Sequence, residues 1–369
     1  MLVKEFLQVF RDPKMRGVIF LMPVVQLLVF GYAVTTDVRR VATAVYDLDN
    51  TVASRELVAR FVDSGYFDVA EYVRDDARAR ELIDRERAKV ILRMNRGFGE
   101  ALRAGRTAQL QVIVDGTDSN TAGIVLDYAA KIVGRFSQKV LITRFVRARG
   151  LPLEPGRVGL QTRAWFNENL ESRNFYVPGV IAIIVMLVTL MLTSMAVVRE
   201  KEIGTMEQIM VTPITPTEFI LGKTVPFAII GFADVILVTV VGVFWFGVPI
   251  RGSLLLLFPA TALFLMTTLG VGLIISTVSQ TQQQAMMTTF FFYFPAVLLS
   301  GFMFPTANMP AIIQWLTYLN PLRYFLVIIR GIFLKGVGPE ILWPQMLALA
   351  VMGCITLWIA ARRFRKTLA

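Results

Sequence analysis

Residues 176–198 read YVPGVIAIIVMLVTLMLTSMAVV, and none of these 23 residues carries a charge. A transmembrane helix needs about 20 mainly apolar residues to cross the hydrocarbon core of a bilayer. Arg173 precedes the run, and Arg199 and Glu200 follow it directly. The run therefore predicts a membrane-spanning helix that is bounded by charges.

Five other segments share this length and composition, so the sequence predicts six spans: 17–36, 176–198, 224–248, 254–278, 285–304 and 341–361. The chain of 369 residues is 55% hydrophobic and 18% charged, whereas soluble domains average about 45–50% apolar and 25% charged residues. We expect an α-helical polytopic membrane protein with six transmembrane helices. Helix one is 17–36, and residues 176–369 carry helices two to six.

Basic residues gather outside the first and last spans: Lys4, Arg11, Lys14, Arg16, Arg362, Arg363, Arg365 and Lys366. Lys and Arg concentrate on the cytoplasmic side of membrane proteins, so both termini are predicted to be cytoplasmic. Such residues also attract anionic membrane lipids. This placement explains the net charge of +11 without nucleic-acid binding.

Residues 1–16 are predicted to form an amphipathic helix in the cytoplasmic interface. Apolar residues of this segment fall on one helical face: Leu2, Val3, Phe6, Leu7 and Phe10. A helix with such a face and a polar opposite side lies along a membrane surface. Pro13 is expected to end it and to turn the chain into the membrane.

Residues 37–175 hold 23 of the 38 Lys and Arg residues and 19 of the 27 Asp and Glu residues. Strand patterns (41–48, 66–73, 89–94 and 108–114) alternate with helix patterns (54–63, 76–85, 97–104 and 120–149). This alternation predicts an inserted α/β extracytoplasmic domain between helices one and two. Asp47-Leu48-Asp49-Asn50 is interpreted as an Asx turn with a helix cap, because a cation loop needs more ligands.

The residue inventory excludes most catalytic chemistry. The chain has no histidine and one cysteine, Cys354, so it lacks imidazole catalysis and a cysteine metal cluster. No G-x-x-x-x-G-K-[ST] motif for ATP occurs. We expect no catalytic residue, no metal site and no cofactor bound by this chain.

The connection 199–223 reads REKEIGTMEQIMVTPITPTEFILGK and is long for a link between neighbouring spans. Ile203, Met206 and Met210 are predicted to form one apolar helical face, with Glu200, Glu202 and Glu207 on a polar face. Pro213 breaks the chain. Thr215 then caps a new helix that has Pro216 at its first position and Glu218 in its first turn. This stiff elbow is either an interfacial turn without a partner or a docking surface for a cytoplasmic subunit.

Asp234 is the one acidic residue within the six predicted spans. A charge at this depth costs about 2.5–3.5 kcal/mol on insertion scales, so Asp234 should face protein or water. It is either a buried hydrogen-bonding group, neutral or not, or a proton or cation site. A proton relay would need further ionisable partners, which the predicted spans lack.

Residues 305–336 contain two apolar pieces that are broken by Pro310 and by Asn320-Pro321, and Arg323 interrupts the second. Two half-helices fit this pattern better than a further spanning pair, because irregular backbone at membrane depth is tolerated when protein buries it. We predict a re-entrant hairpin at the external leaflet.

Several of these stretches together resemble a permease of the type-2 class of ABC exporters. They are RDPK (11–14), RAWFNENLESRNFYVPG (163–179), the elbow (199–223), FWFGVPIRGS (244–253), STVSQTQQQAM (276–286), SGFMFPTANMP (300–310) and LTYLNPLRYFLVIIRGIFLKG (316–336). The resemblance covers nearly the whole chain. It is strongest to bacterial multidrug-type permeases with a large extracytoplasmic domain.

The resemblance implies a subunit of an ATP-driven exporter in the bacterial inner membrane. A separate ABC ATPase subunit would bind ATP and Mg and would face the elbow and the N-terminal helix. A second copy or a sister permease would complete a dimer, a periplasmic adaptor could meet the external domain, and the cargo would be hydrophobic or amphipathic. The alternatives are a secondary transporter, and a membrane-anchored receptor or assembly factor that uses the external domain.

Overall fold

The computed structural model describes residues 13–33, 40–149, 171–204 and 216–367, together with Phe6, Phe10, Arg11, Phe166 and Asn167. The chain forms two compact units. One unit, Thr36–Thr162, holds a sheet with helices, and we call it the α/β unit. The other, Met1–Thr35 with Arg163–Ala369, is helical, and we call it the helical unit.

The α/β unit is built on a four-stranded sheet in the order β2-β1-β3-β4. Its strands are β1 (Val41–Asp47), β2 (Phe67–Tyr72), β3 (Val90–Met94) and β4 (Leu110–Val114). β1 pairs in parallel with β2 and β3, and β4 closes one edge antiparallel to β3. The four predicted strands are confirmed to within two residues at each end.

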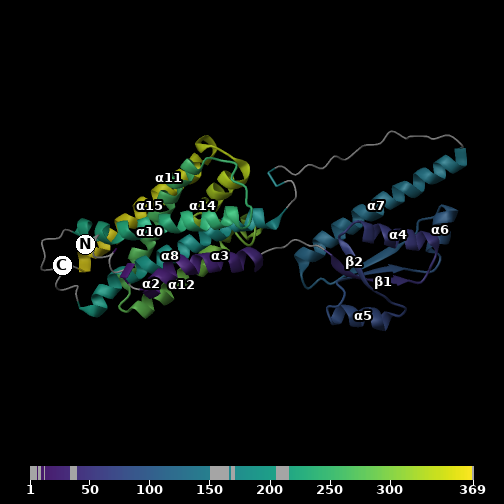
Figure 1. Cartoon of the computed structure of the whole chain (residues 1–369), viewed down its shortest axis with the longest axis horizontal. Helices are drawn as coiled ribbons and strands as arrows, with labels where there is room; N and C mark the ends of the chain where they lie inside the picture. Colours follow the sequence, from purple (N-terminus) through teal and green to yellow (C-terminus); the bar gives the residue numbers. More distant parts are fainter. Residues whose placement is uncertain are drawn as a thin grey trace. The chain divides into compact units, whose positions relative to one another are not determined.

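Helices cover both faces of this sheet: α4 (Val52–Asp63), α5 (Asp76–Asp84), α6 (Phe98–Ala104) and α7 (Ser119–Arg149). Figure 1 shows α4 and α7 on one side of the sheet and α5 on the other. Alternate residues of a strand point to opposite faces. Val45 therefore packs with Phe61 on one face, and the adjacent Ala44 packs with Leu82 on the other. The predicted α/β alternation is confirmed.

The helical unit contains α2 (Pro13–Arg16), η1 (Gly17–Leu21), α3 (Met22–Ala33), α8 (Ser172–Ile203), α10 (Pro216–Phe244), α11 (Leu254–Val278), α12 (Gln282–Leu298), η2 (Thr306–Asn308), α13 (Ala311–Thr317), α14 (Pro321–Arg330), η3 (Gly331–Lys335) and α15 (Pro339–Thr367). Among the described residues, α8, α10, α11 and α15 are long and apolar enough to cross a membrane. These four helices carry the predicted spans 176–198, 224–248, 254–278 and 341–361. A bent pair, α13 with Pro321–Lys335, raises the count to five if it is one span.

The other two predicted spans correspond to shorter helices. Gly17–Ala33 is an apolar helix that begins with a π-helical turn, η1, and continues into α3. α12 has 17 residues. The predicted end of its span at 304 is wrong, because the helix stops at Leu298 and Gly301 turns the chain with a φ of 82°.

α8 is the central helix of this unit, and 83% of its most apolar stretch is buried. Close approach of its neighbours depends on glycines. A Cβ added at Gly272 of α11 would lie 2.8 Å from Cβ of Thr193 on α8. A Cβ added at Gly231 of α10 would lie 2.9 Å from Cγ2 of Thr189. Small residues at these crossings let the backbones approach, as is common between membrane helices.

The helix break at Asn320-Pro321 lies where the sequence predicts it. α13 and the α14–η3 segment meet at 76°. Asn320 caps α14, since its Oδ1 accepts a hydrogen bond from the amide of Leu322, and its Nδ2 donates to the carbonyl of Ala296 on α12 at 2.6 Å. Pro321 occupies the first helical turn, where a missing N–H costs nothing.

Candidate functional site

Three consecutive residues at the end of α8 each hold a different neighbouring helix. Glu200 accepts from Nζ of Lys223 on α10 at 2.8 Å, and the two side chains are only 6% and 3% exposed. Successive residues of a helix point about 100° apart, so three in a row reach partners around much of the helix. Glu200, Lys201, Glu202 and their partners are called the clamp below.

Lys201 and Glu202 bind the termini of two further helices. Nζ of Lys201 donates to the carbonyls of Thr277 and Ser279 at the end of α11, at 3.0 and 3.4 Å. Glu202 accepts from the amide of Gln282 at 2.8 Å, at the start of α12, and from the Gln282 side chain. Each charge suits its place, because helix C-termini attract cations and N-termini attract anions.

An apolar cluster lies at the same end of the bundle. Val197, Phe219, Leu273 and Ala360 pack together from α8, α10, α11 and α15. Ser276 of α11 also accepts from the amides of Val197 and Val198 at 3.0 and 3.2 Å. The ends of four helices are therefore fixed to one another, and we call this the clamp end of the helical unit.

The predicted elbow is only partly within the described residues. Gly204 ends α8 with a φ of 78°, one residue after Ile203, and the apolar face that Ile203 was predicted to share with Met206 and Met210 stays a prediction. Glu200 was also expected on a polar surface, and it is buried instead. α10 is described from Pro216 onward, where the sequence predicts a helix. Met206, Glu207, Met210, Pro213 and Thr215 lie outside the described residues.

The N-terminal segment shows the aromatic part of its predicted apolar face. The rings of Phe6 and Phe10 stack with centroids 6.3 Å apart, and Phe10 lies 6.1 Å from the ring of Phe20. The i and i+4 spacing of Phe6 and Phe10 fits one face of a helix. The other residues of 1–9 and Asp12 lie outside the described residues.

The opposite end of α8 is held by Arg330 at the end of α14. Its guanidinium lies 3.7 Å from the centre of the Phe175 ring, and its Nη1 donates to the carbonyl of Gly301 at 3.4 Å. Residues 175–200 of α8 span about 37 Å at 1.5 Å per residue, and a bilayer core is about 30 Å thick. The clamp and Arg330 thus lie a membrane thickness apart.

The predicted hairpin residues surround this second end. Pro310 is the residue before α13, and Asn320 and Pro321 form the corner with α14. Arg323 lies over the ring of Tyr318 at 4.1 Å and donates to the hydroxyl of Thr317. The Arg323 contacts tie the two half-helices together across their bend.

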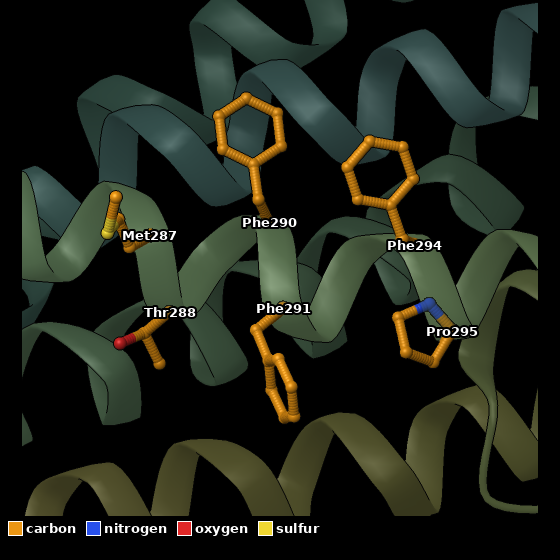
Figure 2. Close-up of a pocket in the computed structure, with 6 residues that line it drawn as sticks. All are labelled: Met287, Thr288, Phe290, Phe291, Phe294 and Pro295. Atoms are coloured by element: carbon orange, nitrogen blue, oxygen red, sulfur yellow. The ribbon is translucent and has the colours of Figure 1, made fainter.

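α12 carries an exposed aromatic face. Ala285, Thr289, Tyr293 and Ala296 are its buried stripe, while Met287 and Phe291 are 66% and 83% exposed. A groove of about 740 Å³ runs along this helix and is lined by Met287, Thr288, Phe290, Phe291, Phe294 and Pro295. Figure 2 shows Phe290 and Phe294 on one side of α12 and Phe291 on the other. The first two rings stack with centroids 5.9 Å apart.

Asp234 of α10 is fully buried, as predicted. Neither of its carboxyl oxygens has a hydrogen-bond partner among the described residues. Gly231, three residues earlier on the same helical side, packs against Leu265 and Thr189. An ion without a partner in such a place is costly, so we expect a neutral carboxylic acid.

The β1–α4 loop of the α/β unit uses its carboxylates internally. Oδ1 of Asp47 accepts from the amides of Asp49 and Asn50 at 3.0 and 2.9 Å. The two oxygens of Asp49 accept from the amides of Gly97 and Gly99, both at 2.8 Å. The interpretation as an Asx turn is confirmed. Thr51 caps α4 with Ser54 in a capping box.

Two opposed effects set the pKa of Asp49. Burial raises this pKa. Hydrogen bonds from the Thr51 hydroxyl and from the amides of Gly99, Gly97 and Phe98 lower it by more than burial raises it, so the pKa of Asp49 lies below its ordinary value. Among the residues that the structure describes, no group of three or more Cys, Asp or Glu side chains could hold a metal ion.

The whole chain matches known transporter proteins. Residues 15–362 match the family described as "ABC-2 family transporter protein". "Probable multidrug ABC transporter permease YbhR" of Escherichia coli (strain K12) is 34% identical over 363 residues, which cover 98% of this chain and 96% of that protein. "Probable multidrug ABC transporter permease YbhS" of the same strain is 35% identical, over 98% and 95%. "Inner membrane transport permease YhhJ" of that strain is 31% identical, over 88% and 85%. The chain, with its membrane-spanning helices held together at the clamp, belongs to the ABC-2 family of transporter permeases.

Proposed function

We propose that this chain is the membrane-spanning permease subunit of an ATP-driven exporter whose ATPase is a separate polypeptide. The observation that carries the proposal is the clamp. A protein that converts ATP hydrolysis into helix motion needs a rigid connection between its cytoplasmic surface and several spans at once. Glu200, Lys201 and Glu202 supply it by joining α8 to α10, α11 and α12.

The ATPase subunit would dock on the segment that leaves the clamp, residues 204–215, and on the N-terminal helix. Met206 and Met210 supply apolar side chains there, and each fully buried one contributes about 1.5–3 kcal/mol. A surface ion pair at Glu207 would add only about 0–1 kcal/mol. Force applied to this segment would pass directly into Glu200–Glu202.

With six spans, both termini and the clamp would lie on the cytoplasmic side of a bacterial inner membrane. α8, α10, α11 and α15 would be joined by α12 and by the Gly17–Ala33 helix. The α13–α14 hairpin and the α/β unit would then be external. The basic residues in the last turns of α15 support this orientation through the positive-inside rule.

The transport pathway would form between two permeases, a second copy or a sister chain. The aromatic face of α12 supports this, because an exposed Met and Phe surface of this kind gains from contact with a partner or a cargo. A hydrophobic or amphipathic compound, drug-like or lipid-like, would suit its lining. Two of the relatives are named as probable multidrug permeases, which agrees with that class of cargo.

Co-purification tests the proposal. The full chain is expressed with a candidate ABC ATPase subunit, and the ATPase that co-purifies is measured together with its substrate-stimulated activity. Met206→Asp should lose both, whereas Glu207→Lys should retain most binding. Normal binding and stimulation in Met206→Asp would place the docking surface elsewhere.

Single cysteines test the orientation in a Cys354→Ala background. Asp68→Cys, in the exposed part of β2, should react with an impermeant thiol reagent added outside. Gln283→Cys, at the clamp end, should react only after the membrane is opened. The reverse labelling would overturn the orientation. A secondary transporter would instead show transport that needs no ATPase subunit.

A further inference from the structure

A second apolar groove opens on the side of the helical unit between α10, α11 and α15, with a volume of about 470 Å³. Its floor is buried, with Ile220 at 8% and Leu269 at 3% exposure. Its rims are open, since Leu221 and Trp358 are more than half exposed. The groove therefore opens on the outer surface of the helix bundle.

The lining of this groove is almost entirely hydrocarbon. Thr224 is a polar residue in it, and its hydroxyl donates to the carbonyl of Ile220 in its own helix. Water in such a groove would find few partners, because a bound water needs about two to four polar groups. An apolar chain is the occupant that this surface favours.

The groove begins at the clamp end and runs toward the middle of the helices. Ile220, at its start, packs with Val197, Leu273 and Ala360 in the cluster of the clamp end. Its wall on α10 continues to Ala228, a distance of about 12 Å at 1.5 Å per residue. One leaflet contributes half of the roughly 30 Å hydrocarbon core. The groove has the length of most of one leaflet.

A positive charge stands at the clamp end of the groove. The guanidinium of Arg362 lies 4.4 Å from the centre of the Trp358 ring, one of the groove's rims. Arg362 is exposed. Arg363 follows it, also exposed. Basic groups beside a cleft between helices on the cytoplasmic side attract anionic headgroups.

We propose that this groove is a binding site for an anionic phospholipid, with one acyl chain along α10 and the phosphate at Arg362. Two features select this occupant: a dry apolar channel one leaflet deep, and a cation at its cytoplasmic mouth. A cationic drug would be repelled by Arg362. The proposal rests on the membrane orientation proposed above and is independent of the ATPase partnership.

The position of the site links it to the clamp. Its α10 wall starts at Ile220, three residues before Lys223, whose ammonium binds Glu200. A lipid seated there packs against the first turns of the helix that leaves the elbow. We expect an anionic lipid to stabilise the clamp end relative to a zwitterionic one.

Quenching of Trp358 fluorescence by brominated lipids tests the site directly. The full chain is prepared with Trp165, Trp245, Trp315 and Trp343 changed to Phe, so that Trp358 is the only tryptophan. It is reconstituted with increasing mole fractions of dibrominated phosphatidylglycerol or dibrominated phosphatidylcholine. Half-maximal quenching should need about fivefold less phosphatidylglycerol, the preference expected of one basic residue near the surface.

Matched variants separate a site from ordinary surrounding lipid. Arg362→Gln should remove the preference, and Arg362→Lys should keep most of it. A chain with Trp343 as its only tryptophan, on α15 and outside the groove, should be quenched equally by both lipids. Equal quenching of Trp358 by both lipids would overturn the proposal. It would also be overturned if an uncharged hydrophobic compound displaced brominated phosphatidylglycerol from the wild-type chain as readily as from Arg362→Gln.

Discussion

The ammonium of Lys223 lies 2.8 Å from the carboxylate of Glu200, and both side chains are almost completely buried. Twenty-two residues separate them in the sequence, and the packing of α10 against α8 brings them together. An ion pair in such a place is weak evidence for stability, because desolvation offsets much of the attraction. Its value lies in fixing one arrangement of two helices.

Removing one partner of this pair should harm the protein more than removing both. Glu200→Met or Lys223→Met alone leaves an uncompensated buried charge and should cost about 3–5 kcal/mol. The double variant should recover most of this loss, because two apolar side chains can pack together. Thermal unfolding of the purified chain in detergent measures the three variants. Additive losses would show that the two residues do not interact.

Gly272 should tolerate no side chain. An added Cβ would lie 2.8 Å from Cβ of Thr193 and 3.3 Å from the carbonyl oxygen of Leu190, so α8 and α11 would have to separate. Gly272→Ala should lower stability by about 1–3 kcal/mol, the usual cost of overpacking. Gly242→Ala is the matched control, because its Cβ would meet only side-chain ends of Ile181 and Val177 at 3.3 Å. Equal melting temperatures would contradict this packing.

Asp234→Asn should retain transport within about twofold, a change of about 0.4 kcal/mol in an activation barrier. The side chain is buried without a partner among the described residues, and asparagine keeps its shape without a charge. Transport is measured in inverted vesicles at several pH values. Abolished transport in a well-assembled variant, with loss of a proton-linked flux, would support the relay that the sequence left open.

The α/β unit should lose stability as the solution becomes acidic. The net pKa of Asp49 is lowered in the folded state, and the Lys139 hydrogen bond lowers that of Glu56 despite its partial burial. A carboxylate with a lowered folded pKa stabilises the fold above its ordinary pKa of about 4, and this contribution disappears as pH falls through the folded value.

Asp49→Asn should therefore lower the stability of the α/β unit by roughly 1–2 kcal/mol at neutral pH. It should also make the loss of stability at acidic pH, which we call the acid limb, less steep. The Nδ2 group of asparagine would face the amide of either Gly97 or Gly99, which would lose its acceptor. Hydrogen exchange of β1 and β3 in the full chain, measured from pH 7 to 3, reports this. The exposed Asp68→Asn is the control. An unchanged acid limb in Asp49→Asn would refute the role of these hydrogen bonds.

The sequence predicted the secondary structure well where local patterns decide it. The edge strands β2 and β4 alternate between more and less buried residues, and residues 254–278 give both the predicted span and α11. The break at Asn320-Pro321 follows from the proline ring alone. The predicted end of the α12 span at 304 was wrong, because the helix stops at Leu298 and the chain turns at Gly301. The sequence alone does not show which glycines adopt the positive φ that such a turn needs.

The clamp could not be predicted in the same way. Glu200, Lys201 and Glu202 read as an ordinary charged helix end, since charges are normal where a span leaves the membrane. Their partners lie 23, 76 and 80 residues away, and only tertiary packing brings them together. One available signal was Lys223, a basic residue directly before the predicted span 224–248, since the acidic Glu200 lies just after the preceding span, 176–198.

Transport per ATP hydrolysed tests the central claim, that the clamp carries force from the ATPase to the spans. The wild-type chain and Lys201→Met are reconstituted with the ATPase subunit, and export of an amphipathic dye is measured against phosphate release. Lys201→Met frees the end of α11 but leaves residues 204–215 intact, so the ATPase should still bind and hydrolyse ATP. The amount of dye exported per ATP hydrolysed should fall roughly fivefold or more, because a coupling free energy of about 1–3 kcal/mol corresponds to a change of that size. An unchanged ratio of export to hydrolysis, with normal ATPase binding, would contradict the account.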